Sequence, residues 1–416
     1  MSDSLPPEII ADILDRLTDA ADLVRCRRVS KQWLSVLDSP DFIQRHLQRS
    51  TAALSNAGLF LRNDDGALFY APDSASDSPR PDPKLPTHPD GALLLGSCRG
   101  LVCFCVNNQR DLVILNPRTG ERRQICNYSP PDFPQHPSPA VNPHISKLDA
   151  RMFVEYSTDS RRGKDVDLEV DGGGLATLVL GGYGFGYDES SDDYKVVRIR
   201  GLVGGGGGVE SHHFRAEIYS VRAESCKIIE PTDLPYPNHR NGVFVCGALN
   251  WVAHNDVLLA LDLGSDGGGF SLLPQPKYIR GRPEVKSLGE LDSCLCLCGG
   301  YYVGDGQGRL DLWVMKEYGE VESWCKVWSI RDPIVVRCGP AFLLGCSAVD
   351  GGGGRRLLFM VDGRVWFWYY PSGDRVEAVD MGGIVGEGGF DAAYCLESLV
   401  RLFDRGYDQK VVLESL

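Results

Sequence analysis

The first fifty residues carry apolar positions at helical spacing. Between Leu5 and Leu17 the apolar residues recur at i, i+4, i+5, i+8, i+9 and i+12, which is one face of a 3.6-residue period. This spacing predicts an amphipathic helix. Two short helices are expected next, around LVRCRRV with Asp22 as cap and around SKQWLSVL, and a further one in SPDFIQRHL with Ser39 as N-cap and Pro40 at its first position. A helical region of about residues 4–48 is too small to bury all of its apolar surface, so a partner is expected.

Beyond about residue 50 the pattern changes to short apolar runs between turns. GLFLRNDDGALFYAP predicts two strands joined at an Asp-Asp-Gly turn, whereas residues 72–90 are rich in Pro, Ser and Asp and are expected to be a flexible loop. Further strand pairs follow, such as GLVCFCV with DLVILNP and SCLCLCG with LDLWVMKEY. The runs of glycine, such as GGGGG from Gly204, are expected to be surface loops, because they bury nothing.

The strand pairs recur about every 45–60 residues, and a turn and a more polar strand tend to follow each pair. Repeated four-stranded units at this period are typical of a β-propeller, in which each sheet buries both faces against its neighbours. A β-sandwich with long insertions is the alternative. Five or six similar units favour the propeller and leave the blade count open.

Composition narrows the possible functions. The chain has 416 residues, 43% of them hydrophobic, and a formal net charge of −13, which argues against a protein that binds the phosphate backbone of nucleic acid. Neither an export signal nor an apolar run of about 20 residues is found, so an intracellular protein outside membranes is expected. The fourteen cysteines lie scattered in apolar runs and are expected to be reduced core residues.

Two motifs suggest chemistry that other features contradict. Cys294, Cys296 and Cys298 alternate along one face of a predicted strand, but structural zinc usually takes paired C-x-x-C knuckles and a fourth ligand. Core packing is therefore expected for them, and also for Cys98, Cys103 and Cys105. The glycines of GGYGFGYDES suggest a phosphate loop, yet the G-x-G-x-x-G order and a following helix are both missing, so a turn between strands is expected.

No catalytic motif is recognisable in the sequence. A Ser-His-Asp order, a G-x-S-x-G elbow and the kinase and metalloprotease motifs are all missing, so a protein without catalytic residues, cofactor or metal is expected. One basic cluster stands out in the acidic chain, namely Arg25, Arg27, Arg28 and Lys31. It is either a solvated helix face or a surface that steers an acidic partner.

The N-terminal sequence resembles the F-box over its whole length. The resemblance lies in the L-P-x-E opening of LPPEIIADILDRL, the R-C-R-x-V-S-K-x-W centre and the S-P-x-F end. The remainder resembles the F-box-associated interaction domain of plant F-box proteins, through GSCRGLVCF, ILNPRTGE, GFGYDESSDDYKVV and the terminal CLESLV, in family order. Residues 159–175 depart from that pattern, because the family usually runs straight into GFGYD.

This resemblance implies a fold and a set of partners. It implies a small all-α F-box domain at residues 1–48, a connector with a strand pair and a loop at 49–92, and an irregular kelch-like β-propeller at 93–416. F-box helices bind a Skp-type adaptor, which connects them to cullin and RING subunits. By their place in the motif, ten residues are expected at or beneath that interface: Leu5, Pro6, Ile9, Ile10, Ile13, Leu14, Leu17, Leu23, Val29 and Trp33.

The expected function is that of a non-catalytic substrate receptor of a Skp-cullin-F-box ubiquitin ligase, whose propeller binds a target protein in the cytoplasm or the nucleus. The target-binding residues are not predicted. The alternative is a propeller that binds a small molecule or acts as an enzyme and uses the F-box for another contact. Kelch-type oxidases need His and Tyr metal ligands near the ring centre, and no such group can be picked out in the sequence.

Overall fold

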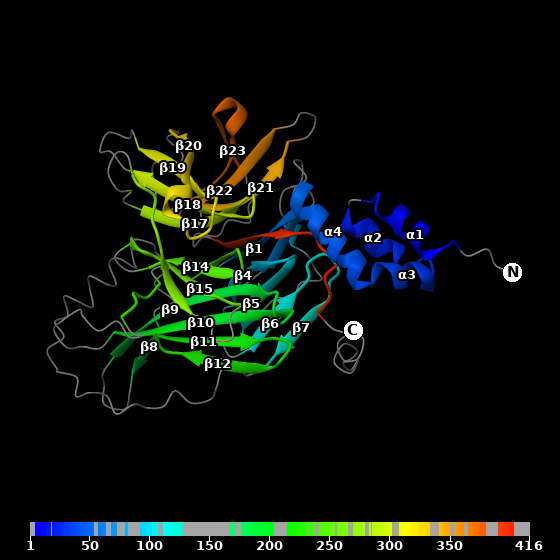
Figure 1. The fold of residues 1–416 in the computed structure, drawn as a ribbon, viewed down its shortest axis with the longest axis horizontal. Coiled ribbons are helices and arrows are strands. Elements are labelled where there is room, and N and C mark those ends of the chain that lie inside the picture. Colours follow the sequence, from blue (N-terminus) through cyan, green and yellow to red (C-terminus); the bar gives the residue numbers. More distant parts are fainter. Residues whose placement is uncertain are drawn as a thin grey trace. The chain divides into compact units, whose positions relative to one another are not determined.

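In the residues that it describes, a computed structural model of the protein (Figure 1) contains four α-helices followed by a long succession of strands. The residues that it describes are 5–17, 19–53, 57–63, 68–72, 80–81, 92–106, 111–126, 128, 167–170, 176–203, 214–231, 233–237, 241–253, 256–264, 269–278, 283, 285–301, 308–332, 341–349, 354–361, 365–379 and 390–402. Most of the predicted Pro-rich and Gly-rich loops, including GGGGG from Gly204, lie outside the described residues.

The four helices begin at residues suited to that position. They are α1 (Pro7–Leu14), α2 (Ala20–Cys26), α3 (Lys31–Leu37) and α4 (Pro40–Ala53). The Ser30 side chain accepts the N–H of Trp33 at 3.2 Å, and that of Ser39 accepts the N–H of Phe42 at 3.3 Å. Each hydroxyl thus pairs an amide that has no partner within its helix. The predicted cap at Ser39 and the proline at the start of α4 are confirmed.

The predicted cap of the second helix is wrong by three residues. Asp19, and not Asp22, is the N-cap of α2, and its carboxylate accepts the N–H of Ala21 at 2.7 Å. Asp22 lies in the first turn, 2.8 Å from Arg25. The helix begins earlier because the two alanines before Asp22 are good helix formers and continue it toward Asp19.

The described strands form six sheets, and within each sheet neighbours in the chain lie side by side, except that β25 pairs with β1. The first three sheets are β1 (Ala57–Asn63), β2 (Leu68–Pro72) and β3 (Arg80–Pro81) with β25 (Phe390–Leu396); β4 (Leu93–Cys98), β5 (Leu101–Val106), β6 (Asp111–Leu115) and β7 (Arg122–Ile125); and β8 (Asp167–Val170), β9 (Ala176–Asp188), β10 (Asp193–Val203), β11 (Phe214–Ser220) and β12 (Ser225–Ile229). The other three are β13 (Val243–Val245), β14 (Ala248–Val252), β15 (Leu258–Asp262) and β16 (Phe270–Leu273); β17 (Val285–Leu291), β18 (Cys294–Tyr301), β19 (Arg309–Met315) and β20 (Trp324–Ile330); and β21 (Ala341–Ala348), β22 (Arg355–Val361), β23 (Val365–Tyr370) and β24 (Arg375–Ala378). Short 3₁₀ turns, Val321–Ser323 and Pro371–Gly373, precede β20 and β24.

Burial along the strands identifies the sheets as blades. β5 and β6 are buried along their whole length, whereas the last strand of that sheet, β7, alternates between exposed and half-buried residues. The outer strands β12 and β24 are also largely exposed. Middle strands buried on both faces, with a polar outer strand, are expected when sheets stack face to face. The fold is a β-propeller, as predicted, and the described residues form six blades, a number that the sequence leaves open. The kelch-like subtype stays a prediction.

The chain divides into two compact units. The first contains Met1–Leu61, Gly66–Cys126 and Ala393–Leu416, and the second contains Arg62–Asp65 and Asn127–Ala392. The first therefore holds the four helices, β1 as far as Leu61, β2, β3, the β4–β7 sheet and the last part of β25. The second holds the sheets from β8 to β24. In the segment expected to be a connector, β1, β2 and β3 join β25 in one sheet.

Candidate functional site

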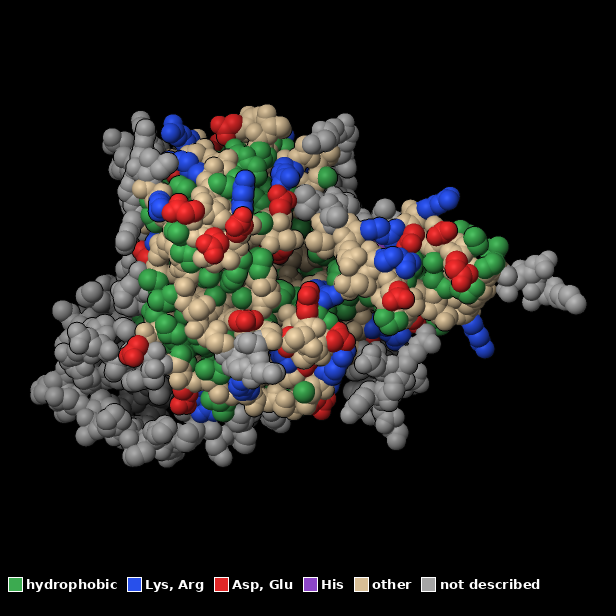
Figure 2. Space-filling view, in the orientation of Figure 1, with side chains coloured by type: hydrophobic (Ala, Val, Ile, Leu, Met, Phe, Trp, Pro, Cys, Tyr) green, Lys and Arg blue, Asp and Glu red, His purple; other side chains and the backbone are tan. Residues whose placement is uncertain are grey.

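Apolar side chains are exposed along one face of the N-terminal helix. The exposed fractions are 48% for Leu5, 45% for Ile9, 39% for Ile13 and 61% for Val29 in the turn before α3. Ile9 and Ile13 are four residues apart and so lie on one face of α1, and Leu5 lies just before the helix. We call these four residues the apolar stripe. Hydrophobic side chains are visible at the surface of the helices in Figure 2.

The opposite face of α1 forms the core of the helices. Ile10 and Leu14 are at most 1% exposed and pack with Leu23, Leu37 and Phe42. The structure thus divides the ten residues predicted at or beneath the interface. Ile10, Leu14 and Leu23 are buried, Leu17 and Trp33 are half-buried against the same core, and Leu5, Pro6, Ile9, Ile13 and Val29 are exposed.

Polar contacts hold α1 against the other helices. The Gln32 amide of α3 donates to the backbone carbonyl of Leu5 at 2.5 Å. At the other end of α1, Asp15 forms ion pairs with Arg45 at 3.3 Å and Arg49 at 2.6 Å, both in α4. Contacts at both ends fix the direction in which the apolar stripe faces.

The basic cluster of the helices separates into different roles. Arg27 is largely buried and lies 3.3 Å from Asp38, and this burial lowers the pKa of its guanidinium. Arg25 is paired with Asp22, while Arg28 and Lys31 are exposed. Arg27 therefore has a structural role, and Arg28 and Lys31 are the members of the cluster available to steer an acidic partner.

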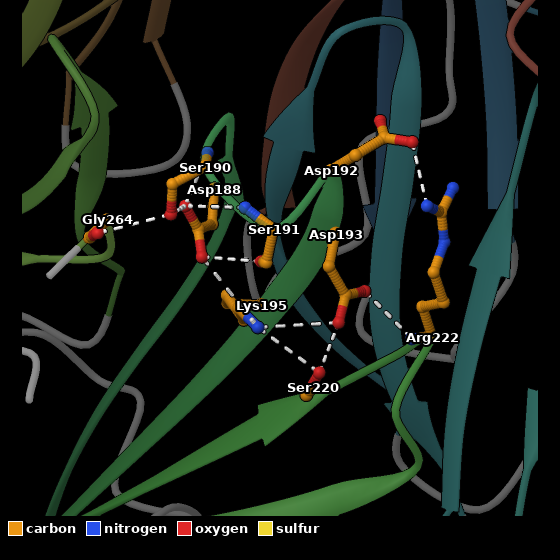
Figure 3. A network of polar contacts seen from close by, with 9 residues as sticks. All are labelled: Asp188, Ser190, Ser191, Asp192, Asp193, Lys195, Ser220, Arg222 and Gly264. Atoms are coloured by element: carbon orange, nitrogen blue, oxygen red, sulfur yellow. Dashed lines mark hydrogen bonds and ion pairs between the residues drawn. The ribbon is translucent and has the colours of Figure 1, made fainter. Parts of the chain in front are cut away.

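A second polar cluster lies where β9 turns into β10 (Figure 3). The carboxylate of Asp188 accepts hydrogen bonds from Ser190 and Ser191, including both hydroxyls at 2.6 and 2.5 Å. Nearby, the Lys195 ammonium lies 3.2 Å from the Ser220 hydroxyl and 3.3 Å from Asp193. A serine beside a lysine is one arrangement of a nucleophile and its base.

The geometry argues against that chemistry. The Lys195 ammonium forms ion pairs with Asp193 at 3.3 Å and Asp188 at 4.0 Å, so two carboxylates of the same turn hold it in a structural contact. The Asp193 carboxylate also accepts the N–H of Arg222 at 2.7 Å. These contacts connect the β9–β10 turn to the end of β11, so the cluster stabilises the blade.

Replacing Asp188 by Asn should make stability less dependent on pH. Burial raises the pKa of Asp188, but the hydrogen bonds from Ser190 and Ser191 outweigh it, so the pKa lies below the ordinary 3.8. The ionised carboxylate then stabilises the fold above about pH 4, and this contribution is lost as pH falls through the lower folded-state value. At neutral pH we expect Asp188→Asn to reduce the free energy of unfolding by about 1–2 kcal/mol. Urea unfolding of both proteins at pH 7 and pH 3 should show that difference shrink in acid; an equal difference at both pH values would contradict this account.

The cysteine rows behave as core residues. Cys103, Cys105, Cys296 and Cys298 are at most 1% exposed, and Cys98 is also buried, whereas Cys294, at the start of β18, is half-buried. Burial raises the pKa of the Cys103 thiol well above its ordinary value, which disfavours the thiolate needed by a metal or a nucleophile. Among the described residues, no group of three or more His, Cys, Asp or Glu side chains could hold a metal ion.

The glycine-rich motif belongs to strand β9, which packs closely on the next sheet. A Cβ atom on Gly184 would lie 2.7 Å from Leu249, and one on Gly186 would lie 2.5 Å from Phe244. Residues 181–188 of the motif lie in β9, and only Glu189 and Ser190 lie in the turn before β10, so the predicted turn is confirmed only for the end of the motif. Its glycines allow two sheets to approach, and they do not form a phosphate loop.

The helices and their apolar stripe agree with what sequence comparison finds. Residues 2–49 match the family described as F-box-like, so the chain has an F-box-like domain followed by a β-propeller. It is similar to "F-box protein CPR1" of Arabidopsis thaliana, with 29% identity covering 80% of this chain and 75% of that protein. It is also similar to "F-box/kelch-repeat protein At3g23880" of Arabidopsis thaliana, with 27% identity over 79% of each.

Likeness to solved structures is low. The crystal structure of a functionally unknown protein from Desulfotomaculum acetoxidans is 9% identical and covers 82% of this chain and 99% of that one, with a TM-score of 0.36. The fold assignment therefore rests on the strand pairing and burial of the chain itself. Within the described part of the chain, no helix has the length and apolar character needed to span a membrane.

Proposed function

We propose that the protein is the substrate-recognition subunit of a Skp-cullin-F-box ubiquitin ligase. The observation that carries the proposal is the apolar stripe on an F-box-like domain. Several exposed apolar side chains on a small rigid helical domain are typical of a protein interface. A Skp-type adaptor is the partner that this domain implies, and through it the chain would be connected to cullin and RING subunits.

The ten residues predicted from the motif take two roles in this proposal. Leu5, Pro6, Ile9, Ile13 and Val29 contact the adaptor, while Ile10, Leu14 and Leu23 hold α1 in place beneath them. Leu17 and Trp33 lie at the border between core and surface. Arg28 and Lys31 steer an acidic adaptor, which would raise the association rate more than the affinity.

The propeller would bind the target protein. Blades form a rigid scaffold, and the loops between strands provide variable contacts. Such a receptor needs no catalytic residue of its own, because holding a target beside activated ubiquitin raises the effective concentration of the target's lysines. Which protein is bound, and by which loops, is not part of the proposal.

Two charges placed on the apolar stripe should abolish adaptor binding. In Ile9→Asp with Ile13→Asp, binding would bury two unpaired carboxylates, and we expect the affinity for a purified Skp-type adaptor to fall by about 100-fold or more. Isothermal titration calorimetry of the full chain measures this. Since both positions are exposed in the free protein, the variant should unfold at nearly the same urea concentration as the wild type.

The matched control is Ile228→Asp. Ile228 lies on the outer strand β12 and is 41% exposed, so the same substitution is made at similar exposure on the propeller. Its adaptor affinity should equal that of the wild type. Unchanged affinity in the folded double variant, or equal losses in the double variant and the control, would exclude the proposed interface.

A further inference from the structure

The last described residues of the chain pack among the first helices. Residues 397–402 follow strand β25, and Leu399 is 0% exposed in the same core as Ile10, Leu14 and Phe42. A side chain that follows strand β25 therefore belongs to the core of the helices. We call residues 397–402 the C-terminal segment.

A buried asparagine in the turn between β6 and β7 holds the C-terminal segment. The Asn116 amide donates to the backbone carbonyls of Ser398 at 3.0 Å and Val400 at 2.9 Å. Its own carbonyl oxygen accepts the N–H groups of Arg118 and Thr119, so the turn between β6 and β7 fixes the side chain. Asn116 is 0% exposed, and each of these hydrogen bonds is made without competition from water.

Charged groups connect the same turn to the helices. The guanidinium of Arg118 lies 2.5 Å from Asp19, the cap of α2, and 3.3 Å from Glu397. Further along the C-terminal segment, Arg401 lies 3.0 Å from Asp38, which follows α3. Burial raises the pKa of Glu397, and the neighbouring Arg118 opposes that rise, so the carboxylate depends on this arginine for its charge.

The β4–β5 turn also fits the C-terminal segment closely. Gly100 has a φ of +80°, and a Cβ atom there would lie 2.2 Å from the Ser398 hydroxyl and 2.7 Å from the carbonyl oxygen of Leu396. Both the backbone conformation and the close approach require glycine. Within one compact unit, the C-terminal segment thus contacts the β4–β5 and β6–β7 turns of the β4–β7 sheet and the core of the helices.

We propose that the C-terminal segment couples two events: the pairing of β25 with β1, which completes the sheet of β1, β2 and β3, and the binding of the adaptor. Strand β25 completes the sheet of β1, and Leu399, shortly after it, belongs to the core of the helices. A chain that has not paired β25 lacks Leu399 in this core, so we expect the helices that carry the apolar stripe to be held less firmly in the binding conformation. The apparent affinity for the adaptor falls by the fraction of chains that have this conformation. Only chains in which β25 has paired with β1 then recruit the ligase.

This inference rests on the proposed function for its partner, while its structural part can be tested without any adaptor. In the full chain, Asn116→Ala removes the hydrogen bonds of this side chain to the C-terminal segment and to the N–H groups of Arg118 and Thr119, and Asn116 is not itself a member of the core of the helices. We expect amides of α1–α4 to exchange hydrogen about tenfold faster or more, and the adaptor to bind about tenfold more weakly.

The matched control is Asn250→Ala. Asn250 is also 0% exposed and donates to two backbone carbonyls, those of Val243 and Ala248, at 3.1 Å each, but in the sheet of β13–β16. Exchange in the helices should not change in this variant. If Asn116→Ala unfolds throughout, Arg401→Ala, at a partly exposed site, replaces it and should accelerate exchange in the helices by a smaller factor.

The outcomes separate the two proposals. Faster helix exchange and weaker binding in Asn116→Ala, but not in Asn250→Ala, support the coupling. Two results for Asn116→Ala would overturn the coupling. One is faster hydrogen exchange in residues 397–402 with unchanged exchange in α1–α4. The other is faster exchange in α1–α4 with the adaptor affinity of the wild type. If the wild type binds no Skp-type adaptor, the proposed function fails, and the exchange data then decide only whether the segment stabilises the helices.

Discussion

Leu14→Asp is expected to unfold the helical domain while the propeller remains folded. Leu14 is 0% exposed in the core that joins α1 to the other helices. Truncating a buried leucine costs about 2–5 kcal/mol, and an unpaired buried carboxylate adds to that cost. A domain of about fifty residues has little more stability than this to lose. Hydrogen exchange should show loss of protection in α1–α4 and preserved protection in β9–β24.

The neighbouring residue provides the comparison. Ile13→Asp introduces the same group one position earlier, where the side chain is 39% exposed, and should leave exchange in the helices nearly unchanged. Adaptor binding should be lost in both variants, but for different reasons: Leu14→Asp removes the fold, and Ile13→Asp removes the contact surface. Similar protection of α1–α4 in the two variants would show that the described division between core and surface is wrong.

Trp251→Ala should be among the most destabilising substitutions in the propeller. Trp251 in β14 is 1% exposed and lies in a core with Phe214 and Leu249. Its indole N–H donates to the carbonyl of Tyr183 in β9 at 3.1 Å, so the residue also joins two sheets. Loss of such a side chain costs about 3–5 kcal/mol through the cavity that it leaves, and the lost hydrogen bond to the Tyr183 carbonyl adds to the cost. Urea unfolding monitored by circular dichroism in the β-sheet region measures the change.

Trp251→Phe divides that loss into its two parts. Phenylalanine keeps most of the apolar volume but cannot donate to Tyr183, so we expect a loss of about 1–3 kcal/mol. The backbone at Gly242 lies against the indole ring of Trp251, since a Cβ atom at Gly242 would lie 2.5 Å from that ring. Because backbone and not a mobile side chain lines the site there, we expect the cavity to be filled only in part. Equal stability of the alanine and phenylalanine variants would mean that packing of the ring contributes little.

The sequence predicts the middle strands of the blades well, because both faces of these strands are buried and nearly every position is therefore apolar. In a propeller β5 and β22 are covered on both faces, so LVCFCV and RLLFMV are apolar almost throughout and are recognisable without knowledge of their partners. The innermost strands are harder to predict. β13 has only three residues, and β25 pairs with a strand from the other end of the chain, which no local pattern indicates.

The sequence predicts the apolar face of the helix that carries the candidate site, but not which side chains of that face are exposed. Periodicity places Ile9 and Ile10 on the same broad apolar face, yet 45% of Ile9 is exposed and 1% of Ile10. The difference depends on how the helices and Leu399 come together in one core, and this is a tertiary property. The roles of Asn116 and Leu399 were missed, although both lie in motifs, ILNPRTGE and CLESLV, that carry the resemblance to F-box-associated domains.

Hydrogen exchange of the wild-type chain, with and without a purified Skp-type adaptor, tests the central claim most directly. The account predicts a stable complex in which exchange slows at α1 and at the turn that carries Val29, while the sheets of β9–β24 change little. No complex, or protection of the blades with exchange at α1 unchanged, would contradict it.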